Sequence, residues 1–302
     1  MESIDPMPNS APRIQPSALL ELLKPITWFP PMWAFLCGAV SVGFNAESPA
    51  VTLVLGILLT GPLVCGASQV VNDWFDRHVD AINEPNRPIP SGRVPGKAGL
   101  YFAIIWSVLA GAWGFSLGLW VGYATLAGLA LAWAYSAPPL RLKRNGWWGN
   151  AAVGISYEGL AWITGAAVFL GSTTPPWQVV VPAALYSLGA HGIMTLNDFK
   201  SIDGDRSMGL KSLPAMLGAD SAARLACVVM LAPQIIIVAL LSYWEAWVQL
   251  ALVALLMAAQ LAAMVRLLRD PRQYAPWYNG TGVTAYVAGM MATATAIQGQ
   301  IL

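Results

Sequence analysis

Nine long apolar segments limit what this chain can fold into. Each is close to the roughly 20 residues that an α-helix needs to cross the hydrocarbon core of a bilayer, which is about 30 Å thick. Residues 98–135 hold no charged side chain, so the boundary within them is placed by length, near Gly118 and Gly122. We expect an all-α polytopic membrane protein whose nine transmembrane helices lie near residues 26–45, 51–72, 98–117, 120–136, 149–170, 178–198, 222–243, 247–265 and 280–300.

The composition agrees with a protein that lies in the lipid bilayer. Hydrophobic residues make up 57% of the chain and charged residues only 10%, against about 25% charged residues in soluble globular proteins. So few charges cannot cover the surface of a water-soluble enzyme of 302 residues. They also exclude a disordered chain and a nucleic-acid binder. The cysteines Cys37, Cys65 and Cys227 lie inside apolar segments, without the spacing of metal ligands or of a disulfide framework.

The positive charges indicate how the helices are oriented. We interpret residues 1–24 as a short cytoplasmic tail and residues 25–302 as one transmembrane domain. With nine spans, all 16 Lys and Arg residues fall on the side of the N-terminus. The positive-inside rule places that side in the cytoplasm and the C-terminus outside. Most acidic residues also lie on the cytoplasmic side, so we expect any chemistry at that mouth of the bundle.

The first motif with chemical content continues directly from the second apolar segment. It carries Asn72, Asp73, Asp76 and Asp80, whose spacings of three and four residues place the side chains on one face of a helix. Stacked carboxylates repel one another and are partly desolvated at a membrane edge. Mg²⁺ would neutralise them, since it takes one or two carboxylates and completes its coordination with water and phosphate. A solvated charged loop would not need this spacing.

A related motif follows the sixth apolar segment. Asn197 and Asp198 again stand at the cytoplasmic end of an apolar helix, and Asp203 and Asp205 follow them. Two acidic helix ends that face each other would bind a diphosphate through bridging Mg²⁺. The basic residues near the two motifs are Arg87, Arg141, Lys143, Lys200, Arg206 and Lys211. Each would either contact phosphate oxygens or simply mark the cytoplasmic side.

These motifs carry a resemblance to a known family. The pattern Asn72-Asp-x-x-Asp-x-x-x-Asp80, followed by Asn83 and Arg87-Pro-Ile-Pro-Ser-Gly92, resembles the first signature of the UbiA-type intramembrane prenyltransferases. The segment from Tyr135 to Lys143 resembles another family segment. Within the family, residues 83–92, residues 197–214 and the opening residues 23–33 are similar to the chlorophyll and bacteriochlorophyll synthase branch. The resemblance covers residues 19–300, and it departs from the family pattern at Asp203, where Glu is expected.

The resemblance implies a nine-helix prenyltransferase bundle in an inner, photosynthetic membrane. The reaction would be Mg²⁺-dependent transfer of a geranylgeranyl or phytyl group from its diphosphate to the propionate of bacteriochlorophyllide, inside a dry cavity lined by aromatic residues. The metal ligands would come from Asn72, Asp73, Asp76, Asp80, Asp198, Asp203 and Asp205. The five of these implied to be catalytic are Asp73, Asp76, Asp80, Asp198 and Asp205. Substrates would contact Asn72, Asn83, Arg87, Tyr135, Arg141, Lys143, Glu158, Asn197, Lys200 and Lys211. The length of the prenyl chain, a chlorin or bacteriochlorin ring, and association with photosynthetic assembly factors stay open.

Three single residues lie outside the two acidic motifs or beside them. Glu158 is the one acid well inside a predicted span, and intramembrane carboxylates are costly and usually functional. It would orient the acceptor, pair with a basic residue, or simply lie at an interface between helices. His191, inside the sixth span, either hydrogen-bonds a neighbouring helix or ligates the metal of a pigment, and we favour the hydrogen bond. His78 is expected to point to water.

Three other functions compete with this interpretation. A cation-coupled transporter also places acids in a helical bundle, but near the bilayer midplane and with internal repeats. An antenna protein that binds pigment would need more histidines inside its spans than the single one found here. A UbiA-type enzyme acting on a quinone or haem precursor would share the acidic motifs and differ only in its acceptor.

Overall fold

The computed structural model describes residues 14–44, 49–171 and 173–301, which are helical except for short connections and one isolated β-bridge. The first half contains α1 (Pro16–Leu23), η1 (Pro25–Thr27), α2 (Phe29–Ser41), α3 (Ala50–Leu58), η2 (Leu59–Cys65), α4 (Gly66–Asn83), α5 (Ala98–Leu117), α6 (Leu119–Ser136) and η3 (Leu142–Arg144). The second half contains α7 (Gly146–Gly154), η4 (Ile155–Leu160), α8 (Ala161–Leu170), α9 (Trp177–Asn197), η5 (Asp198–Ser201), α10 (Ile202–Ser207), α11 (Leu213–Leu217), α12 (Ala219–Tyr243), α13 (Trp247–Leu267) and α14 (Pro271–Ile301).

Seven helices in the described part of the chain are long and apolar enough to cross a membrane. They are Ala50–Asn83, Ala98–Leu117, Leu119–Ser136, Gly146–Leu170, Trp177–Ser207, Ala219–Tyr243 and Trp247–Leu267. Two more helices lie where the first and ninth spans were expected. The first, α2, has only 13 residues, and α14 has 31 residues but is less apolar than the seven. The all-helical membrane fold is therefore confirmed with seven candidate spans.

The expected cytoplasmic tail lies partly outside the described residues, because residues 1–13, including Arg13, are not among them. The rest of it is not a free tail. Residues 16–23 form α1, which packs against α4 and buries Ala18 and Leu22 completely. Arg93 donates two hydrogen bonds to Glu21, at 2.6 and 3.0 Å, and holds α1 against the loop that follows α4. This contact lowers the pKa of Glu21, the largest cause being the hydrogen bond from Arg93.

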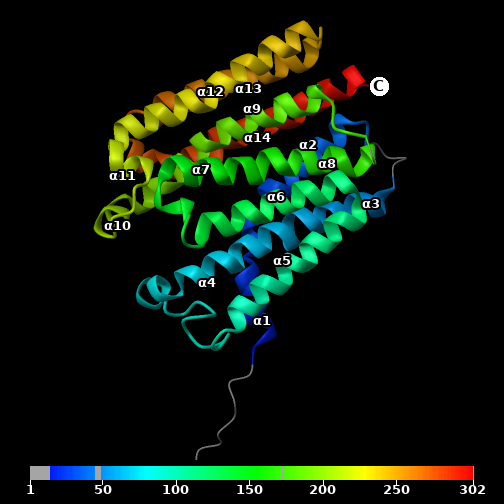
Figure 1. Ribbon diagram of the computed structural model, residues 1–302. Helices are drawn as coiled ribbons and strands as arrows, with labels where there is room; N and C mark the ends of the chain where they lie inside the picture. The colour runs from blue at the N-terminus through cyan, green and yellow to red at the C-terminus, as the bar shows by residue number, and fades with distance from the viewer. Residues whose placement is uncertain (1–13, 45–48, 172, 302) are drawn as a thin grey trace, which may run out of the picture.

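The loops that carry most of the polar motifs gather at one end of the bundle. In Figure 1 the loop after α4, the loop after α6 and the short helices α10 and α11 lie at this end, whereas the C-terminus lies at the other. Backbone hydrogen bonds join two of these loops, since Lys211 donates to Arg144 at 3.0 Å and Gly146 donates to Lys211 at 2.7 Å. At the opposite end, Gly118 connects α5 to α6 with a φ of 150°, which confirms the boundary expected there.

Two spanning helices are widened near the middle by π-helical turns. η2 joins α3 to α4 and contains Pro62, while η4 joins α7 to α8. A π-helical turn adds a residue to the helical ring, and such turns occur often at functional sites. Both wide turns contribute residues to the central cavity described below, so the local departure from α-helix shapes the interior of the bundle.

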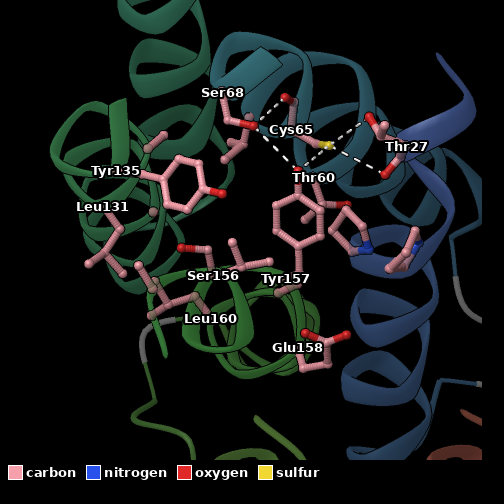
Figure 2. Close-up of a pocket in the computed structure, with 18 of the residues that line it drawn as sticks. Thr27, Thr60, Cys65, Ser68, Leu131, Tyr135, Ser156, Tyr157, Glu158 and Leu160 are labelled. Atoms are coloured by element: carbon pink, nitrogen blue, oxygen red, sulfur yellow. Dashed lines mark hydrogen bonds between the residues drawn. The ribbon is translucent and has the colours of Figure 1, made fainter. Parts of the chain in front are cut away.

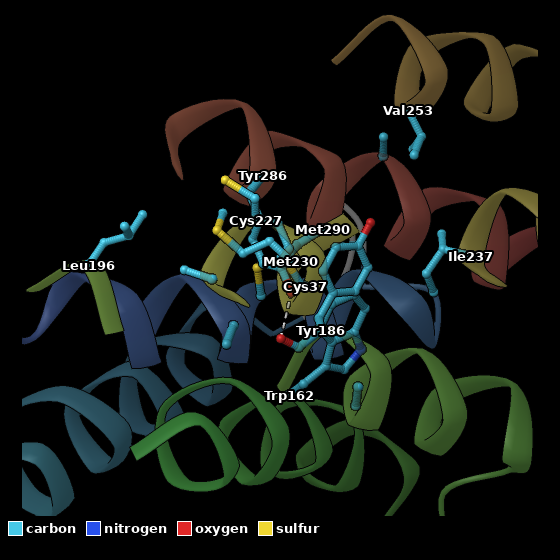
Figure 3. Close-up of a cluster of buried hydrophobic side chains, with 14 of the residues drawn as sticks. Cys37, Trp162, Tyr186, Leu196, Cys227, Met230, Ile237, Val253, Tyr286 and Met290 are labelled. Atoms are coloured by element: carbon cyan, nitrogen blue, oxygen red, sulfur yellow. Dashed lines mark hydrogen bonds between the residues drawn. The ribbon is translucent and has the colours of Figure 1, made fainter. Parts of the chain in front are cut away.

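Helix α2 crosses α8 with the two backbones in close contact. A Cβ atom added to Gly38 would overlap the carbonyl oxygen of Trp162, and one added to Gly165 would overlap the carbonyl oxygen of Phe35. Small residues at membrane helix crossings allow this approach. Next to the crossing, Trp162 stacks on Tyr186 with ring centroids 5.7 Å apart, in the buried cluster that Figure 3 shows. The crossing fixes two walls of the cavity relative to one another.

Replacing Gly165 with Ala should push α2 away from α8. We expect the free energy of unfolding to fall by about 1–3 kcal/mol, the usual cost of overpacking. Gly280 is a matched control, because it also lies within a helix but has no heavy atom within 4 Å of an added Cβ. Gly280→Ala should be neutral or slightly stabilising, since Ala has the higher helix propensity. Equal effects of the two changes on thermal unfolding in detergent would contradict the close crossing.

Candidate active site

A cavity of about 430 Å³ lies inside the bundle, between α2, η2 with α4, α6, η4 with its flanking helices, and α9. Four of the predicted site residues line it, namely Asn72, Tyr135, Glu158 and Asn197. Asn72 and Asn197 are the first residues of the two Asn-Asp pairs. The two motifs, which are far apart in the sequence, therefore reach the same chamber. Most of the remaining lining is apolar, and Figure 2 shows part of it.

Three polar side chains of the cavity wall, Cys65, Ser68 and Gln69, lie against the hydroxyl of Tyr157. This hydroxyl accepts a hydrogen bond from the Gln69 amide at 3.0 Å and one from the Cys65 thiol at 3.3 Å. Figure 2 shows Tyr157 pointing from η4 toward Cys65 and Ser68. Among the described residues, the aromatic side chains that line the chamber are Tyr135 and Tyr157, and no tryptophan is among them. The buried tryptophans pack instead between helices, as Trp162 does.

One edge of the first acidic motif faces α1 and the loop after α4. Lys24 donates to Asp73 at 2.6 Å, and Arg87 lies 3.0 Å from Asp80 and 3.6 Å from Asp73. Asp73 is only 2% exposed, and its second oxygen, Oδ2, is buried without a hydrogen-bond partner among the described residues. Burial opposes the charge of Arg87, but the nearby carboxylates of Asp73 and Asp80 outweigh it and raise the pKa of this guanidinium.

The other edge of the motif faces α6 and the loop after it. Asn72 donates to the hydroxyl of Ser136 at 3.3 Å. Asp76 accepts from Arg141 at 3.1 Å and from Lys143 at 2.5 Å. Burial lowers the pKa of Lys143, even though the carboxylate of Asp76 favours its charged form. The carboxylate of Asp76 and the two cations therefore lie together at the mouth of the bundle, one helical turn from Asn72, which lines the cavity.

The expected single acidic face is thus divided into two edges with different partners. On a helix with 3.6 residues per turn, successive residues are about 100° apart, so Asn72 and Asp76 differ by about 40° and Asn72 and Asp73 by about 100°. That angle is enough to send Asp73 and Asp80 toward α1 and Arg87, and Asn72 and Asp76 toward Ser136 and the loop after α6. Spacing alone could not give this division.

The second motif also separates into residues that turn inward and residues that turn outward. Asp198 begins η5, where the helix tightens after α9. Asp205 is buried and accepts hydrogen bonds from the hydroxyls of Ser201 at 3.1 Å and Ser212 at 2.5 Å. Asp203 has a side chain that is 78% exposed and pairs with Arg272 at 3.2 Å. The structure does not bring Asp203 into the site, in agreement with its departure from the family pattern.

The remaining predicted residues lie at the same end of the bundle but make fewer contacts. Asn83, Lys200 and Lys211 are exposed. His78 is exposed, as expected. His191 lies 3.2 Å, through Nε2, from the backbone carbonyl of Trp147, so the helix-to-helix hydrogen bond that we favoured is confirmed.

Two partners of the motif residues could not be found from sequence spacing. Asn279, on α14, donates from Nδ2 to Oδ1 of Asn197 at 2.8 Å, and its own Oδ1 is buried without a partner among the described residues. Lys24 lies 49 positions before Asp73, in the opening residues 23–33. Neither residue belongs to an acidic motif, so only the packing of α14 and α1 shows their contacts.

The donor set at this end of the bundle suits Mg²⁺ more than a softer metal. It consists of carboxylates and side-chain amides, with Asp73 Oδ2 left without a partner. Within the described residues no three His, Cys, Asp or Glu side chains are grouped closely enough to hold a metal by themselves. Mg²⁺ usually binds through one or two carboxylates and takes its other ligands from water and substrate phosphates. The residues fit a metal that is completed by a diphosphate.

Comparison with known proteins gives consistent matches over nearly the whole chain. The model of the UbiA prenyltransferase family matches residues 23–295. The bacteriochlorophyll synthase 33 kDa chain of Rhodobacter capsulatus is 55% identical over 99% of this chain and 98% of that protein. The chloroplastic chlorophyll synthase of Avena sativa is 40% identical over 92% and 75%. A solved UbiA homologue from Archaeoglobus fulgidus, bound to GPP and Mg²⁺, has a TM-score of 0.65 at 17% identity over 93% of this chain and 99% of that chain.

Replacing Lys24 with Met should leave the buried carboxylate of Asp73 with Arg87 alone. We expect the free energy of unfolding to fall by about 1–3 kcal/mol, less than for a fully buried pair because the Lys24 side chain is partly exposed. Adding Asp73→Asn should restore most of the loss, because it removes the unpaired charge. Unfolding in detergent measures both effects.

Lys97→Met is the matched control for Lys24→Met, because Lys97 is exposed and makes no ion pair among the described residues. It should leave the free energy of unfolding unchanged. A double variant, Lys24→Met with Asp73→Asn, that is no more stable than Lys24→Met alone would show that the ion pair is not the cause.

Proposed function

The chain belongs to the UbiA prenyltransferase family, and from this we propose that it acts as a bacteriochlorophyll synthase. The reaction transfers a geranylgeranyl or phytyl group from its diphosphate to the propionate carboxylate of bacteriochlorophyllide and releases diphosphate. The observation that carries the proposal is the 55% identity to a bacteriochlorophyll synthase chain over nearly the full length of both proteins. The 40% identity to a chlorophyll synthase makes chlorophyllide the alternative acceptor.

The diphosphate would bind at the mouth of the bundle, between the two acidic motifs. Asp76 and Asn72 from α4, with Asp198 and Asp205 from the second motif, are the residues proposed to hold Mg²⁺. When bound, this ion supplies charge that stabilises the departing diphosphate. Arg141 and Lys143 now contact Asp76, and they are placed to transfer part of their hydrogen bonding to phosphate oxygens. Arg87 and Lys24 would stabilise the carboxylates on the other edge.

The cavity would hold the apolar part of the reaction. An allylic cation that forms as the diphosphate leaves must be kept from water. The largely apolar chamber next to Asn72 and Asn197 would exclude water from the cation. Tyr135 and Tyr157 line this chamber, and their rings would stabilise positive charge there. The acceptor propionate is already ionised at neutral pH, so the reaction needs no strong general base.

The same proposal assigns the membrane arrangement. With α2 and α14 added to the seven candidate spans, the proposed number is nine, which would put the N-terminus and the acidic mouth on one side and the C-terminus on the other. With the positive charges inside, the mouth faces the cytoplasm of the inner, photosynthetic membrane. A soluble prenyl diphosphate head group and a membrane-bound prenyl chain would then both reach the site. Protein partners are not assigned.

Replacing Asp76 with Asn should nearly abolish transfer without unfolding the bundle. We expect less than about a tenth of the wild-type rate, because the metal is asked to supply several kcal/mol of charge stabilisation. The measurement is esterification of bacteriochlorophyllide by purified protein with geranylgeranyl or phytyl diphosphate, and chelation of Mg²⁺ should stop it. Asp203→Asn should keep most of the activity, since Asp203 faces water. Prenylation of a quinone precursor with no esterified pigment would reject the proposed acceptor.

Replacing Asn279 with Leu should disturb the amide of Asn197 on the cavity wall. We expect kcat/KM to fall about tenfold, which corresponds to the loss of one hydrogen bond that orients a site residue. Asn279→Asp should shift the Mg²⁺ concentration needed for half-maximal rate, because Asn197 must turn its NH₂ group toward the new carboxylate. Thr281→Ala, on the same helix, is the control. An unchanged Mg²⁺ dependence in both Asn279 variants would limit Asn279 to a structural role.

A further inference from the structure

Glu158 differs from the acidic residues of the two motifs. It lies in the π-helical turn η4, in the middle of the span Gly146–Leu170, and it lines the central cavity. In the described part of the chain its carboxyl group makes no hydrogen bond and no ion pair, whereas Asp73, Asp76, Asp80 and Asp205 all have partners. A carboxyl group without a partner inside a membrane protein is costly and indicates a ligand.

The depth of Glu158 relative to the acidic mouth can be obtained from its neighbour. Tyr157 contacts Cys65 and Gln69, which precede Asp76 on the same continuous helix by eleven and seven residues. At 1.5 Å per residue, the Tyr157 hydroxyl therefore lies about 10–17 Å along that helix from Asp76, and Glu158 is the next residue after Tyr157 in η4. In a tetrapyrrole acceptor, the central metal is separated from the propionate carboxylate by the length of the propionate arm and half of the ring. If the propionate reaches the prenyl diphosphate at the mouth, the metal lies deeper in the chamber by that distance.

We propose that Glu158 is the axial ligand of the metal at the centre of the tetrapyrrole acceptor. This inference rests on the proposed function. A chelated Mg²⁺ has its equatorial positions filled by the four ring nitrogens and keeps an axial position open, which takes a lone pair from a carboxylate oxygen while no ring bond is broken. Carboxylate oxygen is a hard ligand that suits Mg²⁺. Among the described residues that line the cavity, Glu158 is the only carboxylate.

His191, which was considered as a ligand of a pigment metal, is less suitable. Its Nε2 already lies 3.2 Å from the carbonyl of Trp147, and the ring packs beside Trp147 with centroids 5.8 Å apart. It also lines a different cavity, on the other side of η4, together with Ile155 and Leu188. The central chamber, where the two Asn-Asp motifs meet, is lined by Glu158 and not by His191.

The proposal predicts that Glu158 selects the metallated pigment. The experiment measures the binding of bacteriochlorophyllide and of its metal-free counterpart to the full-length protein in detergent, by quenching of pigment fluorescence. Glu158→Leu should weaken binding of the Mg²⁺ pigment by at least about tenfold, the lower end of the effect of losing even an outer-shell partner of a metal. Binding of the metal-free pigment should change less than twofold. Glu158→Gln, which keeps the size and an oxygen ligand, should lie between wild type and Glu158→Leu.

Three results separate this inference from its alternatives. Tyr157→Phe is the matched control in the same turn, and it should affect the two pigments equally. Equal weakening of both pigments by Glu158→Leu, or no weakening of either, would overturn the metal contact while leaving the synthase function standing. A wild-type protein that binds the prenyl diphosphate and neither pigment would overturn the proposed function itself. Resonance Raman bands that report the coordination of the bound metal should differ between wild type and Glu158→Leu.

Discussion

A charge that lies against hydrocarbon must have a partner, and this requirement organises the polar end of the bundle. Asp73, which lies in the candidate span Ala50–Asn83, is only 2% exposed. Each carboxylate of the first motif accordingly contacts a cation from another segment. Asp73 pairs with Lys24, which follows α1, and Asp80 pairs with Arg87 in the loop after α4. Asp76 pairs with Lys143 in the loop after α6. These ion pairs are the contacts that assemble the mouth of the site from distant parts of the chain.

The interior of the bundle depends on a different feature, the width of two helices. A regular α-helix in place of η2 or η4 would rotate the following residues and move Cys65 or Tyr157 out of register. In the structure the Tyr157 hydroxyl of η4 accepts a hydrogen bond from Cys65, which joins the two wide turns, and another from Gln69 in the first turns of α4. The same turn presents Glu158 to the chamber. The polar contact between the turns and the apolar cavity beside them thus have one structural origin.

The sequence predicted what depends on apolar length and on local spacing. The break at Gly118 and the continuation of the second span into the acidic motif are both confirmed, because hydropathy and helical periodicity decide them. Two partners of the motif residues could not be predicted. Lys24 is 49 residues from Asp73, and Asn279 is 82 residues from Asn197, so only tertiary packing brings them together. The π-helical turns could not be predicted either, because they do not change the hydropathy of the spans that contain them.

The two edges of the first motif differ in how readily they can exchange partners. Asp73 is almost fully buried under Lys24, and separating this pair would leave a carboxylate in a poorly solvated position, which costs far more than the pair itself contributes. The Asp76 side chain is 21% exposed, and its two cations lie in a loop at the open mouth. Water or Mg²⁺ can therefore replace Arg141 and Lys143 at Asp76 at a smaller cost, and the two cations are then free to bind a phosphate. This difference in solvation, more than position in the motif, favours Asp76 as the acid that works on the substrate and Asp73 as the acid that holds α1 in place.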